Sequence, residues 1–410
     1  MPRSVYKFPP AVESCVGTLL EGVSTVALAR AVAALSAFFT SHRAARPKDY
    51  LATAENRSAY LAYFLSANYS KLQAVFDEMK PLLVDQLLAP SRRGLGDRGA
   101  FRVLDLGAGP GTMTLAALEY LSGVSPQAEV QFCAVDSSRE MLKTCETLFH
   151  CVRGRLGIEE RRARLRTRVA TLQEFLRRPP PGPELSGPFD IIVLANVWNE
   201  LVEAGPMALP TQSALIEGLL ARLEDHGALI LIEPALRETS RTLHLLHNAV
   251  LERIPAANVF APCVHQWACP CVTSGNKKDW CHTEFEWRPT NQMTQIDQRI
   301  GNRKDALKFS YLVLRKDGKN VLDLKRLSGT PAEESACWRV VSELIVEKGK
   351  QRAFLCGEAG RVQFTRLDRH ESPTNQAFGD LIRGDLVKIT GAKPRGEEGR
   401  IAEATEVERV

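Results

Sequence analysis

The sequence contains no uninterrupted apolar run long enough to cross a membrane. A membrane-spanning helix needs roughly 20 predominantly apolar residues with few charges, and residues 11–39 are interrupted by Glu13, Glu21 and Arg30. Residues 1–10 also lack the features of a secretory signal peptide and the arginine- and serine-rich character of a strong transit peptide. We therefore expect no membrane association and a cytoplasmic location, with the mitochondrial matrix as the alternative.

A strong excess of one charge is also absent. The net charge of +5 over 410 residues does not by itself indicate a nucleic-acid partner. The basic residues are nevertheless uneven, because nine arginines and only three glutamates lie between Cys151 and Arg178. A second basic run extends from Arg288 to Arg326. Each run is consistent with either a solvated surface or a patch that faces RNA.

A glycine-rich segment, FRVLDLGAGPGT at residues 101–112, joins an expected apolar strand to an expected helix. Gly107, Gly109 and Gly111 let the backbone approach a ligand closely, because they have no Cβ atom. The spacing is GxGxG with Asp105 just before it, which departs from the dinucleotide fingerprint GxGxxG. The segment resembles the first motif of class I S-adenosylmethionine-dependent methyltransferases.

Two further strand ends belong with this motif. The strand expected at residues 130–135 ends in Asp136, whose carboxylate is suited to accept hydrogen bonds from both hydroxyls of a ribose. The apolar run at residues 189–194 reads as a buried parallel strand, and ANVWNEL at its end places Asn196 where α/β sheets hold their ligands. We therefore expect a class I methyltransferase-type, Rossmann-like α/β sheet that binds S-adenosylmethionine through these residues: Asp105, Gly107, Gly109, Gly111, Asp136 and Asn196.

Groups that would carry out methyl transfer are missing from these segments. The loop Asn-Pro-Pro-aromatic, which many enzymes that methylate base amines use, does not occur, and ANVWNEL contains no nucleophilic cysteine. The spacing C-x3-C-x2-C of radical enzymes that use an iron–sulfur cluster is absent as well. No catalytic residue can be named from the sequence, so enzymatic activity stays open.

Cysteines are concentrated in one polar segment, PCVHQWACPCVTSGNKKDWCH at residues 262–282. Cys263, Cys269, Cys271 and Cys281 have the spacing C-x5-C-x-C-x9-C, which differs from the paired C-x2-C of zinc ribbons. A polar loop has no core of its own, and metal–thiolate bonds would fix its shape. Because ten cysteines without an export signal indicate a reducing compartment, we expect a metal site in preference to disulfides. An iron–sulfur cluster tolerates irregular spacing, so iron–sulfur and zinc both stay open on chemistry alone.

The order of expected elements divides the chain into three parts. Residues 1–95 are expected to form a helical N-terminal region, and residues 96–326 the methyltransferase-type domain with a cysteine-rich insertion at about 255–307. Residues 327–410 show short strands with glycine turns, which indicates a small β-rich module of the oligonucleotide-binding type. Cys356 lies in this module, from which a cysteine can reach back to the metal site.

Several segments together resemble one family. These are NRSAYLAYFLSANYSKL, VLDLGAGPGT, ANVWNEL, LILIEPALR, APCVHQWACPC, DWCH and KFSYLVL. Their succession is similar to that of the methyltransferase-like assembly factors of the mitochondrial ribosomal small subunit and their bacterial relatives.

The resemblance implies a 4Fe–4S cluster bound by four cysteines. By motif position these are Cys263 of APC, Cys269 of the CP pair, Cys281 of DWCH and Cys356 of FLCG. Cys271 departs from the family pattern, so Cys269 and Cys271 remain alternatives for one ligand. Zinc is the alternative metal.

The resemblance also implies a function in ribosome biogenesis or translation. The protein is expected to bind small-subunit ribosomal RNA and the ribosomal particle, and to be a monomer when free. The alternative is an active S-adenosylmethionine-dependent methyltransferase that acts on ribosomal RNA. Neither the target nucleotide nor the basic run that contacts RNA follows from the sequence.

Overall fold

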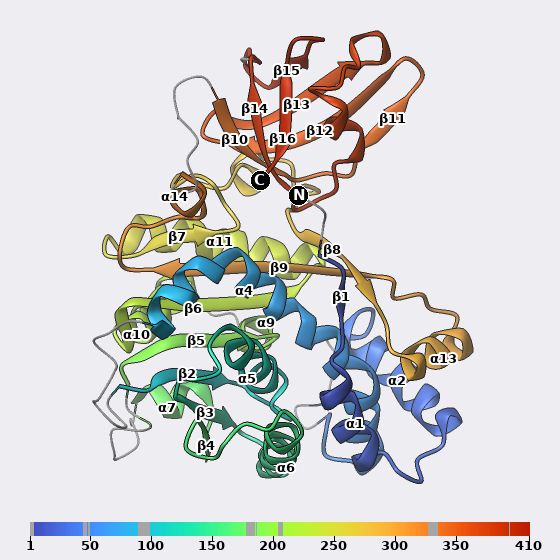
Figure 1. Ribbon diagram of the computed structural model, residues 1–410, viewed down its shortest axis with the longest axis vertical. Helices are drawn as coiled ribbons and strands as arrows, with labels where there is room; N and C mark the ends of the chain where they lie inside the picture. Colours follow the sequence, from blue (N-terminus) through green and yellow to red (C-terminus); the bar gives the residue numbers. More distant parts are fainter. Residues whose placement is uncertain are drawn as a thin grey trace.

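A computed structural model describes residues 4–43, 47, 50–88, 99–177, 185, 187–203, 208–326, 335–392 and 394–410 (Figure 1). Its centre is a nine-stranded sheet with the strand order β1-β8-β9-β6-β5-β2-β3-β4, in which β7 also pairs with β9. The strands are β1 (Tyr6–Lys7), β2 (Phe101–Leu106), β3 (Val130–Asp136), β4 (Ala163–Val169), β5 (Phe189–Ala195), β6 (Leu223–Pro234), β7 (Asn258–Ala261), β8 (Thr283–Arg288) and β9 (Ala306–Arg315).

The strand directions establish the fold class. Strands β2 to β6 pair in parallel, as the near-continuous apolar sequence of β5 predicts, whereas β9 runs antiparallel to β6. An antiparallel strand that follows five parallel ones in this order is the arrangement of class I methyltransferases. The predicted fold class is therefore confirmed.

Helices cover both faces of this sheet (Figure 1). Successive strand residues such as Val103 and Leu104 point to opposite faces, and they belong to separate apolar cores. Helices α4, α5 and α6 pack into the first core, and α7, α10 and α11 pack into the second. The helices are α4 (Leu65–Leu88), α5 (Thr112–Val124), α6 (Arg139–Arg155), α7 (Leu172–Arg177), α9 (Trp198–Glu203), α10 (Leu209–Leu220), α11 (Arg237–Arg253), α12 (Pro270–Thr273), α13 (Asn291–Ile300) and α14 (Val321–Arg326).

The N-terminal region is helical and lies against the first core. It consists of α1 (Pro10–Leu19), α2 (Thr25–Phe39), α3 (Ala54–Ala59), the π-helical turn η2 (Tyr60–Phe64) and α4. Cys15 on α1 forms a disulfide with Cys151 on α6, a pairing that the sequence did not predict. Across the described residues, no helix combines the length and apolar character that a bilayer span requires.

A second, seven-stranded sheet forms the C-terminal β module, with its own core around Trp338 and Phe364 (Figure 1). Six of its described strands lie on one path from β15 to β16, and β11 pairs with β12 beside this path, so the oligonucleotide-binding type stays a prediction. The elements are β10 (Ser335–Val340), β11 (Ile345–Glu347), β12 (Lys350–Gly357), β13 (Gly360–Leu367), η5 (Asp368–His370), η6 (Gln376–Asp380), β14 (Leu386–Thr390), β15 (Glu398–Ile401) and β16 (Glu406–Arg409).

The expected domain boundaries fall at segments that are not described. The boundary at 95/96 lies within residues 89–98, and the boundary at 326/327 lies at residues 327–334, both outside the described residues. Most of the proline-rich connection at 177–188 is also outside them. The cysteine-rich segment, expected as an insertion, contains β7, β8 and α13, and both strands pair with β9 of the main sheet. The cysteines are thus attached directly to the edge of that sheet.

Candidate functional site

The glycine loop follows β2 and adopts a conformation that requires glycine. Gly107, Gly109 and Gly111 have φ angles of 74°, 53° and 85°, a region that other residues rarely adopt. A Cβ atom at Gly107 would overlap Val197, and one at Gly111 would overlap Cys145. At Gly109, by contrast, no described atom lies within 4 Å of that position. The outer side of Gly109 is therefore the open side of the loop, where a ligand can approach the backbone.

Asp105 and Asp136 fix the shape of this loop. Asp105 accepts hydrogen bonds from the backbone N and Oγ1 of Thr114 at 2.9 and 2.8 Å, which ties the end of β2 to the first turn of α5. Burial raises the pKa of Asp105 to about 7. Asp136 accepts from Gly109 N at 2.9 Å and from Ser138 N at 2.7 Å, and burial raises the pKa of its carboxyl group. Asp136 therefore lies beside the loop as predicted, and both of its oxygens already accept a backbone hydrogen bond.

The N-terminal region contributes a side chain beside the glycine loop that the sequence analysis missed. Tyr60 in η2 lies near Asn68 on α4 and Thr112 at the start of α5, and it is close enough to Asp136 for that carboxylate to affect the Tyr60 pKa. Burial is the main cause that raises this pKa to about 12. Helical turns of the π type occur frequently at functional sites. The sequence feature that could have indicated this contribution is the set of polar residues within the otherwise apolar segment NRSAYLAYFLSANYSKL.

Polar groups also meet at the carboxyl ends of β5 and β6. Asn196 has a φ of 61° and is the one non-glycine among the described residues with a left-handed backbone, which makes it a candidate for a functional position. Glu233 accepts hydrogen bonds from Trp198 N at 3.0 Å and from Asn199 Nδ2, and burial raises its pKa to about 7. From the N-terminal region, Arg43 donates to Asn199 Oδ1 over 2.9 Å.

A buried lysine lies under the same strand ends. Lys71 on α4 donates to Asn68 Oδ1 over 2.8 Å, and its side chain is nearly inaccessible to solvent. Burial lowers the pKa of its ammonium group to about 7, with a smaller contribution from the charge of Lys304. The surroundings of the strand ends therefore combine groups of the main sheet with groups of the N-terminal region.

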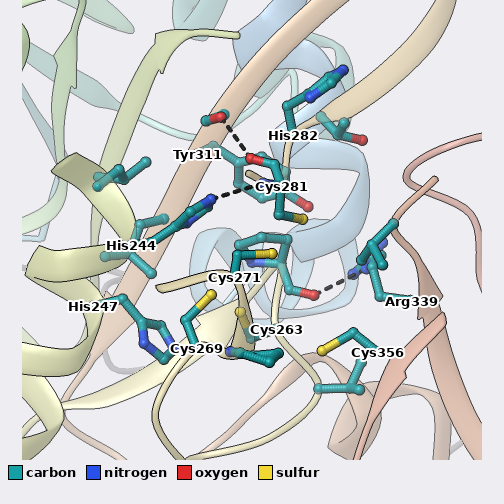
Figure 2. A pocket seen from close by; sticks show the side chains of 18 of the residues that line it. His244, His247, Cys263, Cys269, Cys271, Cys281, His282, Tyr311, Arg339 and Cys356 are labelled. Atoms are coloured by element: carbon teal, nitrogen blue, oxygen red, sulfur yellow. Dashed lines mark hydrogen bonds between the residues drawn. The ribbon is translucent and has the colours of Figure 1, made fainter. Parts of the chain in front are cut away.

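A second site, which we name the thiol pocket, is a cavity of about 50 Å³ lined by five cysteines. Figure 2 shows Cys263, Cys269 and Cys271 together, with Cys281 above them and Cys356 reaching in from the opposite side. Cys356 lies on β12 of the C-terminal β module. Cys271 lies in α12, and Cys263, Cys269 and Cys281 lie in the loops between β7 and β8. The cysteines predicted as ligands, Cys263, Cys269, Cys281 and Cys356, thus line one cavity, and Cys271 lines it as well.

Hydrogen bonds hold the cysteine-bearing loops in place. Cys269 N donates to Asn248 Oδ1 at 2.7 Å, and Cys281 N donates to Nε2 of His244 at 3.0 Å, so α11 anchors both segments. Cys356 Sγ lies 3.4 Å from Nε2 of His265, which connects the C-terminal β module to the loop after β7. The His265 ring stacks on Trp267 with 3.8 Å between ring centroids.

The electrostatics of the thiol pocket favour neutral side chains. Burial raises the pKa of the Cys263 thiol to about 12 and also raises the pKa of Cys281 and Cys356. The hydrogen bond between Cys269 and Cys271 raises the pKa of Cys269 and lowers that of Cys271. Burial lowers the pKa of His265 to about 4. A cationic centre would reverse this preference for the thiols, because metals bind the thiolate form.

The donor chemistry of the pocket agrees with a thiolate-bound centre, because clustered cysteines are the ligands of zinc and of iron–sulfur clusters. In the part of the chain that the structure describes, however, no group of three or more His, Cys, Asp or Glu side chains is arranged to hold a metal ion. The described thiols surround the cavity, and they do not converge on one ion position. The residue types therefore fit such a centre, whereas its identity does not follow from their present arrangement.

Comparison with solved structures gives only weak likenesses. They include a putative S-adenosylmethionine-dependent methyltransferase from Streptococcus mutans (TM-score 0.32, 10% identity, covering 57% of this chain and 46% of that one). Another is precorrin-6y C5,15-methyltransferase from Geobacter metallireducens (TM-score 0.30, 14% identity, 58% and 86% covered). A third is a methyltransferase from Pyrococcus furiosus (TM-score 0.30, 13% identity, 53% and 75% covered). This chain thus spans less than half of the Streptococcus protein.

Likenesses of this strength carry no argument about function. No curated protein matches the sequence. A family model does match residues 54–385, which include the glycine loop, all five cysteines of the thiol pocket and the whole of α4. Since this match extends over well more than half of the chain, the protein belongs to the family described as mitochondrial small ribosomal subunit Rsm22.

Proposed function

We propose that the protein is an assembly or translation factor of the small ribosomal subunit that binds S-adenosylmethionine and ribosomal RNA and holds a structural 4Fe–4S cluster. The observation that carries the proposal is the family match over residues 54–385, on a chain with the class I methyltransferase fold. A ribosomal partner is an expectation from the family description, and the two pockets support the two cofactors independently of it.

S-adenosylmethionine is proposed for the site at the glycine loop. The open side of Gly109 and the carboxylate of Asp136 lie next to each other, so a nucleoside would approach the loop backbone closely beside an acceptor for its ribose hydroxyls. We assign Asp105, Gly107, Gly109, Gly111, Asp136 and Asn196 to this pocket, and add Tyr60 from the N-terminal region. A cofactor bound there would supply an electrophilic methyl group.

A 4Fe–4S cluster is proposed for the thiol pocket, with Cys263, Cys269, Cys281 and Cys356 as ligands and Cys271 as the alternative to Cys269. A cluster has four separate iron positions, so its ligands surround a volume and need not meet at one point. The cysteines around the thiol pocket surround a cavity in this way. Because Cys356 lies on the C-terminal β module and the others do not, the cluster would join the two sheets. Zinc is the alternative metal.

Binding without methyl transfer is favoured over the alternative, an RNA methyltransferase. The candidate acid–base group Glu233 is buried and engaged by Trp198 N and Asn199. The next polar group, Glu200, accepts a hydrogen bond from Tyr50 at 3.3 Å, and Arg43 reaches Asn199. Side chains of the N-terminal region therefore engage the polar groups at these strand ends.

The proposal is tested in cells by crosslinking the protein to RNA and sequencing the bound transcripts. Strong enrichment of small-subunit ribosomal RNA is expected, and an RNA profile equal to that of an unrelated basic protein would refute the assembly function. Methyl transfer is tested separately with labelled S-adenosylmethionine and small-subunit RNA from cells that lack the protein. Labelled RNA would establish the enzyme, and we expect none.

The family description supports the mitochondrial matrix, the alternative location, over the cytoplasm. We propose that the free protein is a monomer, which sedimentation of the purified chain would test. A stable dimer at micromolar concentration would contradict this.

A further inference from the structure

The loop that follows α12 is held in place by arginines from two other elements. Its sequence is SGNKKDW, residues 274–280, and we name it the lysine–tryptophan loop. Nη1 of Arg241 on α11 donates hydrogen bonds to the carbonyl oxygens of Cys271 and Asp279 at 2.8 and 2.6 Å. Nη1 of Arg361 on β13 donates to a carboxylate oxygen of Asp279 over 2.8 Å. Since α11 packs on the main sheet and β13 belongs to the C-terminal β module, the loop has a fixed position beside both.

Three side chains of the lysine–tryptophan loop face solvent: Lys277, Lys278 and Trp280. Trp280 is 36% exposed, and it is the one aromatic residue among the described large apolar side chains that are exposed. The ring of His282 lies nearly parallel to that of Trp280, with 19° between the ring planes and 6.1 Å between the centroids. This is the offset arrangement that aromatic pairs favour. An exposed tryptophan held in one orientation can stack on a further flat ring.

The charge that the lysine–tryptophan loop presents to solvent is positive. Its single carboxylate, that of Asp279, is neutralised by the ion pair with Arg361. Within the described part of the chain, neither Lys277 nor Lys278 lies within ion-pair distance of a carboxylate. Two ammonium groups therefore lie only two and three residues before the exposed ring of Trp280.

Both basic runs of the sequence differ from this loop, because they contain ion pairs within the chain. These pairs include Arg153–Glu160 and Arg161–Glu159 in the first run, and Arg303–Asp305 and Arg315–Asp317 in the second. Charge alone therefore does not identify an RNA-binding surface on either run. The lysine–tryptophan loop combines its charge with an exposed aromatic ring.

We propose that the lysine–tryptophan loop binds single-stranded RNA, with a base stacked on Trp280 and phosphate groups beside Lys277 and Lys278. This inference rests on the proposed function, and it adds the surface at which RNA is bound and the form of RNA that this surface takes. A base can stack on an aromatic side chain only when it is not already stacked within a duplex. Lysines attract the phosphates independently of base sequence. An aromatic ring beside cationic groups is the combination that single-strand binding surfaces use.

An anionic membrane surface is the other kind of partner that tryptophan and lysine suit. Binding to a membrane interface increases with the apolar area that is buried in it, and it typically uses a whole helix face. The lysine–tryptophan loop exposes a single large apolar side chain, that of Trp280. RNA is therefore the partner that this loop fits better, and vesicles serve as a comparison in the test.

The test uses the full chain, purified without oxygen, and measures affinity by fluorescence anisotropy at several salt concentrations. The probes are a transcript of small-subunit ribosomal RNA, a short polyuridine strand and a blunt RNA duplex of the same length as that strand. The variants are Trp280→Ala, Trp280→Phe and the pair Lys277→Gln, Lys278→Gln. The matched control pair, Lys143→Gln and Lys348→Gln, removes two exposed lysines from α6 and from the turn after β11. Iron content and melting temperature show whether each variant keeps its thiol pocket and its fold.

Trp280→Ala is expected to bind the polyuridine strand roughly 5- to 100-fold more weakly, the usual effect of removing one stacking partner. Its affinity for the duplex and its salt dependence should stay unchanged, and Trp280→Phe should retain most of the affinity. Replacing both lysines should lower the slope of log affinity against log salt by about 1.4 on the strand, because each single-strand contact contributes about 0.7. The control pair should keep the slope of the unmodified protein.

Equal affinity of Trp280→Ala and the unmodified protein for the polyuridine strand would overturn this inference and leave the proposed function standing. Equal losses on strand and duplex, together with loss of iron, would show that Trp280 acts only on the fold and would overturn it as well. If Trp280→Ala kept its RNA affinity and lost binding to vesicles that contain phosphatidylserine, the loop would be a membrane surface. If the unmodified chain did not bind the small-subunit transcript, the proposed function would fail and this inference with it.

Discussion

Arg339 on β10 donates a hydrogen bond to Oε1 of Glu78 on α4 over 2.7 Å, although the two residues are 261 positions apart. Their side chains are only 6% and 16% exposed. Arg339 also donates to the carbonyl oxygen of Pro262, next to the thiol pocket, and Tyr311 on β9 donates to Glu78. This ion pair therefore connects the N-terminal region, the main sheet, the cysteine loops and the C-terminal β module.

Removing one charge of this pair should destabilise the protein strongly. In the variant Glu78→Gln the guanidinium of Arg339 stays buried without a counter-charge, and such a change typically costs about 3–5 kcal/mol. The measurement is the free energy of unfolding from denaturant titration. The matched control is Glu284→Gln, which breaks the more exposed pair with Lys308 and should cost less than about 1 kcal/mol. Equal losses in the two variants would show that the buried pair has no special role.

Serine substitutions in the thiol pocket should separate ligands from bystanders. The protein purified without oxygen is expected to contain iron and sulfide equivalent to about one cluster per chain. Cys263→Ser, Cys269→Ser, Cys281→Ser and Cys356→Ser should each lose most of the iron and melt at lower temperature, because metal binding and folding are linked. Cys271→Ser is the matched control and should retain iron.

Two results would contradict this assignment. If an anaerobic preparation contained zinc and no iron, the thiol pocket would be a zinc site and not an iron–sulfur site. Loss of iron from Cys271→Ser, together with its retention in Cys269→Ser, would exchange the two ligands and leave the rest of the set unchanged.

The sequence predicted those parts of the molecule that local pattern determines. The glycine loop, the strand ends at Asp136 and Asn196, and the class I sheet follow from short apolar runs and turn residues, and the structure contains them. The family resemblance is confirmed by the match over residues 54–385. The cysteine ligands remain a prediction, although all four line the thiol pocket.

What the sequence did not predict depends on contacts between distant segments. Tyr60 reaches Thr112 only because α4 packs beside α5, and no local pattern encodes that packing. The pair Glu78–Arg339 requires the C-terminal β module to lie against α4. Long-range packing therefore decides which polar residues become part of a site.

Replacing Gly109 by valine should abolish S-adenosylmethionine binding. Valine strains a backbone with a φ of 53°, which costs about 1–3 kcal/mol, and its side chain would fill the open side of the loop. Gly157→Val is a matched control, because Gly157 has a φ of 66°, equally open surroundings and a position in the turn after α6. Calorimetry should detect no binding for the first variant and normal binding for the second. Unchanged affinity in Gly109→Val would exclude the glycine loop as the cofactor site.

The buried carboxyl of Glu233 should make stability fall as the pH rises. Burial raises the Glu233 pKa from 4.5 to about 7, so between these values the unfolded chain loses this proton while the folded chain keeps it. The free energy of unfolding then decreases with pH across this window, by up to about 3 kcal/mol for a shift of this size. Glu233→Gln removes the contribution, and its stability should vary less between pH 4.5 and 7.

Asp105, whose pKa is also raised to about 7, likewise makes the free energy of unfolding decrease as the pH rises. The Glu233→Gln variant should therefore still lose some stability across this pH window. Lys71 has the opposite effect outside this window, since its pKa is lowered from 10.5 to about 7 and stability should rise above pH 7. Denaturant titrations at half-unit pH intervals measure both the fall in stability between pH 4.5 and 7 and its rise above pH 7. Glu252→Gln, which removes an exposed carboxylate on α11, is the control and should follow the unmodified protein. If the stability of Glu233→Gln varied with pH as that of the unmodified protein does, Glu233 would be ionised in the folded protein at pH 5. Its assignment as a buried neutral acid would then be wrong.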